Sequence, residues 1–150
     1  MTLQEAYTYF ENLKTNSTET SEIKVYDKFL HILNSLKTRD FSEVEIESLE
    51  TELDRLNLNS NPENKKKHFK KTLSDFKKYL KDSFSLTTKG YYTNLYSGLG
   101  LVFGLLFGVA ILSNMERSLG ISLGLIGGMV LGSIMGRNKD AKAKASGNII

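Results

Sequence analysis

Two long stretches without charged residues lie in the last third of the chain and constrain its fold more than any other feature. They cover residues 90–115 and 118–136, which is 26 and 19 residues. A helix rises about 1.5 Å per residue, so about 20 residues cross a hydrocarbon core of about 30 Å. Only residues 113–120 are available for a reversal. The pattern predicts a hairpin of two antiparallel transmembrane helices.

A pair of buried helices in a soluble core is the alternative interpretation of these stretches. With 150 residues in total, the chain has too few other elements to cover two helices that are apolar on every side. The preceding part differs sharply in composition, because residues 1–89 hold 30 of the 37 charged side chains and no glycine. The two parts are therefore expected to meet different environments.

Helix-capping residues and the spacing of apolar residues predict four amphipathic helices in residues 1–89. Capping boxes start at Thr2 and Ser42, the second helix spans roughly residues 21–36, and Asn61-Pro62 predicts the start of a fourth helix that ends near Asp82. The expected core stripes are Leu3, Ala6, Phe10 and Leu13; Tyr26, Phe29, Leu30, Leu33 and Leu36; Val44, Ile46, Leu49, Leu53 and Leu56; and Phe69, Leu73, Phe76 and Leu80. The predicted class is all-α, a four-helix N-terminal soluble domain followed by a two-helix transmembrane hairpin.

Glycines recur every four residues in both apolar stretches. A helical glycine costs about 1 kcal/mol relative to alanine in water, whereas in lipid small residues let two helix backbones approach closely. Since four residues turn about 400°, five glycines sweep about 160° of surface, which we expect to exceed what one partner helix covers. The alternative is that the glycines only close the hairpin. The residues predicted for helix packing and oligomerisation are Gly100, Gly104, Gly108, Gly120, Gly124, Gly128, Gly132 and Gly136.

The segments GLGLVFGLLFG at residues 98–108 and GISLGLIGGMVLG at residues 120–132 resemble the glycine-zipper two-transmembrane proteins of bacteria. The resemblance covers about a third of the chain and implies a membrane hairpin, with no activity attached. The whole chain also resembles small flavobacterial membrane proteins.

Basic residues flank the apolar stretches and are sparse between them, where only Arg117 beside Glu116 is charged. The positive-inside rule therefore predicts a two-pass protein of the bacterial inner membrane with both termini cytoplasmic. The expected parts are a soluble domain at 1–83, a juxtamembrane connector at 84–93, the hairpin at 94–136 and a basic cytoplasmic tail at 137–150. Residues expected to meet lipid headgroups are Lys77, Lys78, Lys81, Lys89, Arg137, Lys139, Lys142 and Lys144.

The third and fourth predicted helices carry opposite charges. The fourth carries eight lysines between residues 65 and 81, where Asp75 is the only acidic residue, whereas the third is rich in aspartate and glutamate. The two helices can pair across the bundle with solvated charged faces, or the basic helix can lie against anionic lipid. Nucleic acid is the least favoured partner, because few aromatic residues interleave the lysines and the net charge is only +3.

The residues that enzymes and metal sites need are sparse. The chain has no cysteine, and its two histidines, His31 and His68, have no partner at ligand spacing. We expect no catalytic, cofactor-binding or metal-binding residue, no cofactor and no cleavable signal peptide. The favoured function is a membrane-anchored helical adaptor that forms homo-oligomers in the lipid bilayer and binds a cytoplasmic protein partner. The alternative is an oligomeric pore or channel-like effector.

Overall fold

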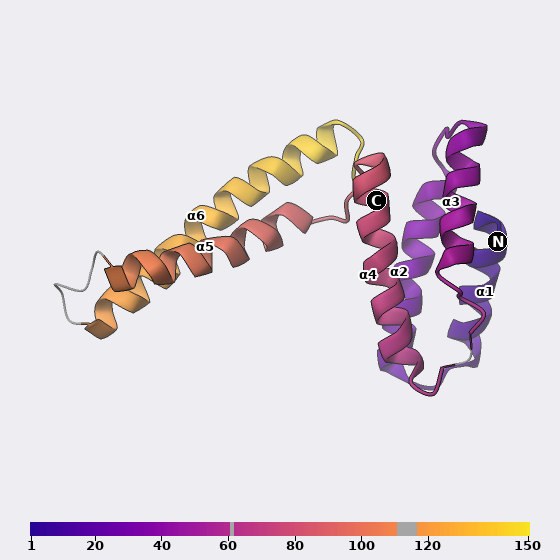
Figure 1. Ribbon diagram of the computed structural model, residues 1–150, viewed down its shortest axis with the longest axis horizontal. Coiled ribbons are helices and arrows are strands. Elements are labelled where there is room, and N and C mark those ends of the chain that lie inside the picture. Colours follow the sequence, from indigo (N-terminus) through magenta and orange to yellow (C-terminus); the bar gives the residue numbers. More distant parts are fainter. Residues whose placement is uncertain (61, 111–116) are drawn as a thin grey trace. The chain divides into compact units, whose positions relative to one another are not determined.

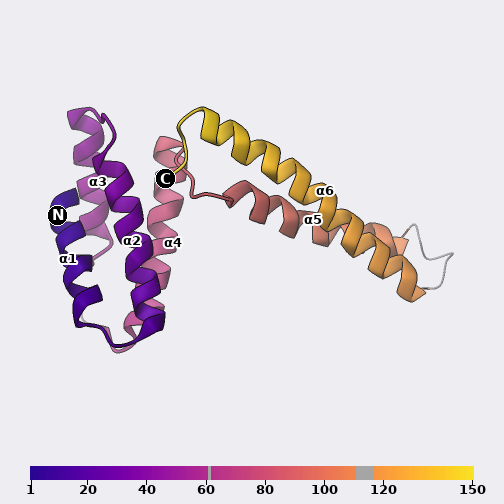
Figure 2. The ribbon, with the colours of Figure 1, turned by 180° about the vertical axis from the view of Figure 1, so that it is seen from behind.

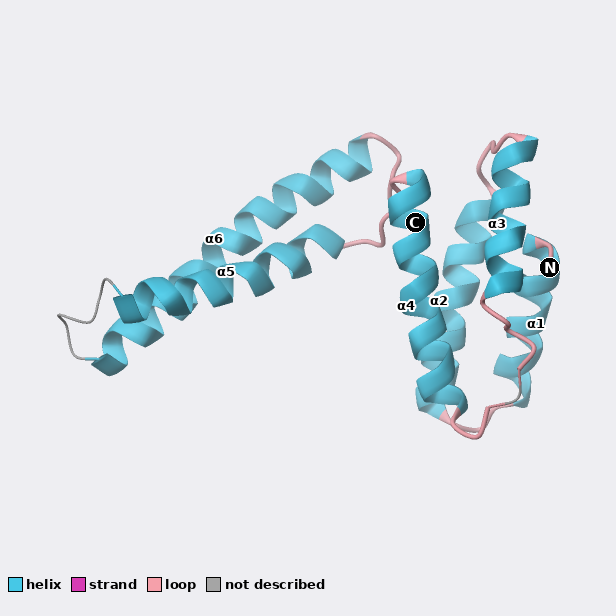
Figure 3. Cartoon of the chain, in the orientation of Figure 1, coloured by secondary structure: helices cyan, strands magenta, loops and turns pink. Residues whose placement is uncertain are grey.

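The computed structural model describes residues 1–60, 62–110 and 117–150, and these residues fold into helices joined by short connections (Figures 1 and 3). The chain divides into two compact units, residues 1–86 together with Ile150, and residues 87–149. The predicted all-α class is confirmed, with helices in the first unit and a helix pair in the second. The helices are α1 (Leu3–Asn16), α2 (Thr20–Lys37), α3 (Glu43–Arg55), α4 (Lys65–Phe84), α5 (Tyr91–Ala110) and α6 (Arg117–Ala145).

The first unit is held together by an aromatic core. The ring of Phe10 on α1 stacks on Phe29 of α2 with centroids 4.1 Å apart, and Phe69 of α4 meets Phe10 edge-on at 5.6 Å. All three rings are buried. The predicted stripe of α4 is confirmed, because Phe69, Leu73, Phe76 and Leu80 are all buried. Packing of α1 and α4 against α2 therefore forms the centre of the unit.

Helix starts follow the predicted capping chemistry in two cases. Thr2 and Ser42 each accept a hydrogen bond from the backbone N–H three residues on, and the glutamate at that position accepts one from the cap N–H in return. The fourth helix starts later than predicted. Asn64 caps α4 by accepting from the N–H of Lys67, so Pro62 precedes the helix, and the predicted cap Asn61 lies outside the described residues.

The predicted apolar stripe of α3 is wrong at its N-terminal end. Val44 is 75% exposed and Ile46 38% exposed, whereas Glu52 is only 6% exposed. The buried side of α3 is formed by Leu49, Glu52 and Leu53, which share one helix face at spacings of three and four. Glu52 tolerates this position because both of its carboxylate oxygens accept hydrogen bonds from the Arg55 guanidinium, at 2.6 and 2.7 Å.

The second unit consists of α5 and α6, which lie side by side as an antiparallel pair (Figure 2). Both are long and apolar enough to cross a membrane. The helices are longer than the predicted spans: α5 begins at Tyr91, and α6 continues to Ala145 through most of the predicted tail. A parallel bridge between Thr87 and Ile149 joins the two ends of the unit. The predicted outward loop with Glu116 lies in residues 111–116, outside the described residues.

Candidate functional site

The most distinctive site in the chain is the contact between α5 and α6, where glycine backbones meet directly. A Cβ atom built at Gly100 would meet the backbone of Gly128, one at Gly104 would meet Gly124, and one at Gly108 would lie 2.6 Å from the carbonyl oxygen of Gly120. Real Cβ atoms do not approach backbone atoms this closely, so each of these positions requires glycine at this helix separation. The four-residue glycine period thus forms the seam of the hairpin.

The seam continues beyond the α5 glycines with other small residues. Gly132 lies against the backbone of Tyr96 and Ser97, where an added Cβ would be 3.1 Å from the Ser97 Cα. Gly136 lies against Thr93 and the carbonyl oxygen of Tyr92, at 2.6 Å from an added Cβ. The α5 side of the seam is therefore a row of threonine, serine and glycine.

This geometry is the one expected if the glycines close the hairpin, and a further role of the ladder in oligomerisation stays a prediction. All eight predicted glycines lie on the intramolecular seam: Gly100, Gly104, Gly108, Gly120, Gly124, Gly128, Gly132 and Gly136. Gly98 and Gly127 are different, since an added Cβ at either meets no described atom within 4 Å.

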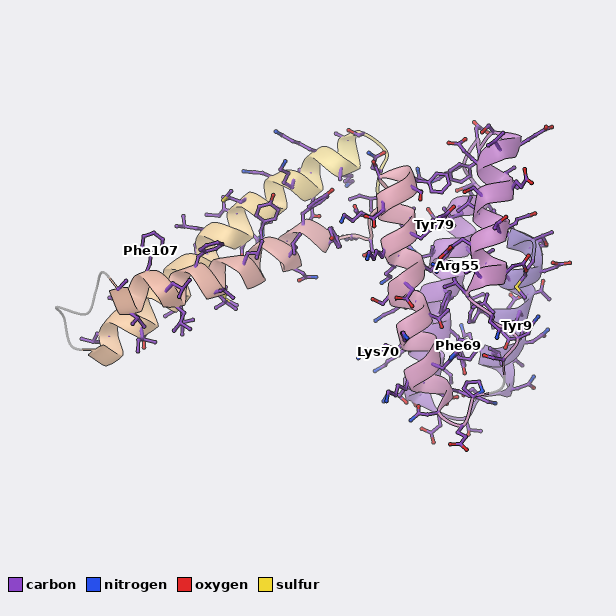
Figure 4. All side chains as sticks on the ribbon, viewed as in Figure 1. Tyr9, Arg55, Phe69, Lys70, Tyr79 and Phe107 are labelled. Atoms are coloured by element: carbon purple, nitrogen blue, oxygen red, sulfur yellow. The ribbon has the colours of Figure 1, made fainter. Side chains whose placement is uncertain are left out.

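An apolar groove of about 490 Å³ runs along one side of the seam. Phe103 and Phe107 of α5 and Leu123 and Leu131 of α6 flank it, and Gly127 lies in its lining. Both phenylalanines are more than half exposed, and Figure 4 shows Phe107 projecting away from the helix pair. Gly98 is not part of this lining. Among the described residues of the hairpin, only this groove combines a glycine that does not contact the other helix, Gly127, with exposed phenylalanine rings.

Polar side chains close the end of the hairpin where α5 begins and α6 ends. The Oγ atoms of Ser97 and Ser133 are 2.8 Å apart, and each also lies within hydrogen-bond distance of the carbonyl four residues earlier in its own helix; since each hydroxyl has one proton, one serine donates to the other while the second donates to its own helix carbonyl. The Asp140 carboxylate accepts from the backbone N–H groups of Tyr92 and Thr93, each at 3.0 Å, and from the Thr93 hydroxyl at 2.6 Å. Asp140 on α6 therefore caps the first turn of α5.

Asp140 was not predicted from the sequence, although a signal was present. It lies four residues after Gly136 and so continues the four-residue ladder of α6, and it is the only acidic residue in 137–150. The free N–H groups of a helix start attract a carboxylate. Because the partner is 47 residues away along the chain, local capping rules do not reveal it.

The basic residues predicted to meet lipid headgroups fall into two groups. Within the second unit, Lys89, Arg137, Lys139, Lys142 and Lys144 are all exposed at the end that Asp140 closes. Three tyrosines, Tyr91, Tyr92 and Tyr96, occupy the first turns of α5 at the same end. The hairpin thus has one basic, tyrosine-rich end.

Three further lysines of that prediction lie on α4 in the first unit. Lys78 is exposed, whereas Lys77 and Lys81 are half-buried. Burial, together with the nearby charge of Lys28, lowers the pKa of Lys77. Lys77 is therefore a weaker candidate for a headgroup contact than Lys78.

The histidines do not form a ligand set in the structure. His31 is exposed on α2, and the Nε2 of His68 lies 3.1 Å from the Ser60 hydroxyl. Within the described residues, no group of three or more histidine, cysteine, aspartate or glutamate side chains is arranged to hold a metal ion.

Comparisons of the chain with protein-family models, with curated proteins and with solved structures find no match. The resemblance to glycine-zipper proteins therefore stays a prediction, and the function has to be argued from the geometry of the two units.

Proposed function

We propose that this chain is a non-enzymatic integral membrane protein of the bacterial inner membrane. The hairpin anchors the four-helix unit as a cytoplasmic adaptor and self-associates through its outer groove. The observation that carries the proposal is the surface of the hairpin, where large apolar side chains are exposed all around two helices. Examples are Val102 at 58%, Leu106 at 59% and Ile126 at 63%. Water penalises such a surface, whereas lipid does not.

The polar end of the hairpin supports an orientation. Basic side chains and tyrosines gather at the end where α5 starts, which is the composition of a cytoplasmic membrane interface. The helix α6 has 29 residues, or about 43 Å at 1.5 Å per residue, which is longer than a hydrocarbon core of about 30 Å. Its last turns, with Lys142 and Lys144, then extend among the headgroups. Both termini are cytoplasmic in this arrangement.

The occupant that we propose for the groove is the hairpin of a second copy. The ladder glycines contact the opposite helix of the same hairpin, whereas Gly127 lines the groove and does not. Gly127 therefore has the usual free-energy cost of a glycine in a helix without contributing to the hairpin seam. Flanking rings of Phe103 and Phe107 add apolar contact area for a helix docked against Gly127. Close approach at a small residue is the usual basis of helix association in lipid.

The test compares Gly127→Ile with Gly98→Ile in the full-length protein. Neither glycine touches the partner helix, so both variants keep the hairpin seam, but only Gly127 lies on the groove. Counting chains per lipid nanodisc by single-molecule photobleaching should give fewer chains for Gly127→Ile and an unchanged count for Gly98→Ile. A wild-type protein that is monomeric, or equal counts for the two variants, would refute groove-mediated association.

An oligomeric pore is the competing function, and the paired serines weigh against it. Within residues 91–110 and 119–136 the serines are Ser97, Ser122 and Ser133, and the hydroxyls of Ser97 and Ser133 lie 2.8 Å apart across the hairpin, so two of these three are directed toward each other and not toward a pore. Purified protein in liposomes should therefore leave an ion gradient intact. Reproducible leakage at low protein density would overturn the adaptor proposal in favour of the pore.

A further inference from the structure

Two helices of the first unit present rows of opposite charge to solvent. On α3, Glu43, Glu47 and Glu50 follow one another at spacings of four and three; Glu43 and Glu47 lie away from the buried side formed by Leu49, Glu52 and Leu53, and Glu50 borders on it. Glu43 and Glu47 are exposed and Glu50 is half-buried. We call these three glutamates the acidic face.

The matching row on α4 consists of lysines. Lys67, Lys71 and Lys78 lie at positions i, i+4 and i+11, opposite the buried Phe69 and Phe76, and all three are exposed. We call these three lysines the basic face. Figure 4 shows that the neighbouring Lys70 likewise projects away from α4 into solvent. Both faces begin with the same four-residue step, so the first two charges of one face can meet the first two of the other.

The two faces do not neutralise each other within the unit. Among the described residues, none of the six charged groups of the two faces belongs to an ion pair within 4.0 Å. The helices instead meet through the hydroxyls of Ser48 and Tyr79, which are 2.6 Å apart. The two helices thus contact each other through these hydroxyls, and their charged faces remain in solvent, as expected for the first of the two predicted arrangements.

The arrangement has features of a surface that is incomplete in one copy. The first turn of α4 holds three consecutive lysines, Lys65 to Lys67, and no acidic residue, although a helix start favours negative charge. Val44 is 75% exposed on the same side of α3 as Glu47, in the middle of polar surroundings. An opposite charge and a small apolar contact from a partner would relieve both features.

We propose that the acidic face of one copy docks on the basic face of a second copy of this chain. Each face contains one exposed pair of charges four residues apart, Glu43 with Glu47 and Lys67 with Lys71, and the opposite signs of these two pairs make the chain its own complement. The inference rests on the proposed function in one respect: exposed ion pairs are individually weak, and confinement in one membrane plane raises the effective concentration of the units. Because the two faces differ, the contact is head-to-tail, so it builds rings or chains.

A charge-swap experiment tests this docking. The full-length protein is reconstituted in phosphatidylcholine vesicles with and without anionic lipid, and Förster transfer is measured between copies labelled at a cysteine that replaces exposed Asn34. One variant carries Glu43→Lys with Glu47→Lys, and the other carries Lys67→Glu with Lys71→Glu, so each reverses one of the two exposed pairs. Each variant alone should lose transfer severalfold, because both of its faces then have the same sign. An equal mixture of the two variants should recover transfer.

Several controls separate this contact from the alternatives. Lys24→Glu with Lys28→Glu reverses two exposed charges on α2 and should leave transfer unchanged. Raising the salt from about 0.1 M to about 1 M shortens the screening length from about 10 Å to about 3 Å and should reduce the wild-type signal. Circular dichroism confirms that every variant is folded.

Three outcomes would overturn the proposal. They are unchanged transfer in folded single variants, no recovery in the mixture, and loss of transfer confined to vesicles with anionic lipid, which would assign the lysines to headgroups. The Gly127→Ile variant separates this contact from the hairpin contact. If that variant leaves the chain count unchanged while the charge-swap mixture recovers transfer, the groove proposal fails and the docking proposal stands.

Discussion

Replacing Gly128 by alanine should open the hairpin, whereas the same change at neighbouring Gly127 should not. A Cβ at position 128 would lie 2.8 Å from the Gly104 Cα and closer still to the carbonyl oxygen of Gly100. Ordinary contact starts at 3.4 Å, so the helices must separate by at least 0.6 Å at this point. A gap of that size already forfeits about a quarter of the local dispersion energy, and overpacking of this kind costs about 1–3 kcal/mol.

Comparing the stability of Gly128→Ala with that of Gly127→Ala cancels the contribution of helix propensity. Both changes gain the same preference of alanine over glycine, about 1 kcal/mol in water, and at position 127 the new methyl group meets no described atom. Gly128→Ala should therefore be about 1–3 kcal/mol less stable than Gly127→Ala. The two variants differ by one position on the same helix and share all other composition.

The assay is unfolding of the hairpin by sodium dodecyl sulfate in mixed micelles. Förster transfer between dyes on cysteines introduced at exposed Asn94 and Asn138 reports separation of α5 and α6, and the chain has no cysteine of its own to interfere. Gly128→Ala should unfold at a lower detergent fraction than Gly127→Ala. Equal midpoints, or a higher midpoint for Gly128→Ala, would refute the claim that backbone contact at the seam holds the hairpin together.

Three further predictions concern single side chains. Phe10→Ala should destabilise the first unit by about 3–5 kcal/mol in urea, because its ring is fully buried against Phe29, whereas Val44→Ala should change it little; similar losses would contradict the assigned core. Asp140→Ala should speed amide hydrogen exchange at the start of α5, since two N–H groups lose their acceptor, and unchanged exchange would show that the cap is dispensable. Burial and the charge of Glu22 raise the pKa of Tyr26 to about 12. The stabilisation from this raised pKa is fully present below about pH 10 and is lost as the pH rises towards 12. Tyr26→Phe should therefore make the free energy of unfolding depend less on pH in that range, and an unaltered pH profile would argue against the raised pKa.

Much of the first unit could be predicted because its helices carry strong local signals. Capping boxes at Thr2 and Ser42 satisfy backbone groups within four residues, and the stripe of α4 contains large apolar side chains at regular helical spacing. The start of α4 was predicted three residues too early because Asn61 followed by proline is a typical helix start. Asn64 competes with Asn61 for the same role.

The orientation of α3 could not be predicted from its own sequence. Val44 and Leu49 both fit a helical stripe, and the choice between faces depends on which side meets the rest of the unit. Burial of Glu52 is acceptable only because Arg55, one turn later, binds both carboxylate oxygens. Such a pair looks like an ordinary surface pair in the sequence.

The hairpin shows the same division between local and distant signals. The glycine period predicted a close seam, but the sequence does not tell whether the opposing backbone belongs to the same chain. The α5 partners of Gly132 and Gly136 are serine and threonine, which break the glycine pattern in the sequence while preserving small size. Asp140 reaches the start of α5 only because the seam fixes the two helices in register.

Membrane insertion of both helices is the central claim of this account, and cysteine accessibility in intact membranes tests it most directly. Single cysteines would replace Leu106 on α5 and Ile126 on α6, which are 59% and 63% exposed on the hairpin, and exposed Lys66 in the first unit. A membrane-impermeant maleimide should label position 66 from the cytoplasmic side and leave positions 106 and 126 unlabelled until the protein is denatured. Rapid labelling of either position in intact membranes would place that helix in water and contradict the account.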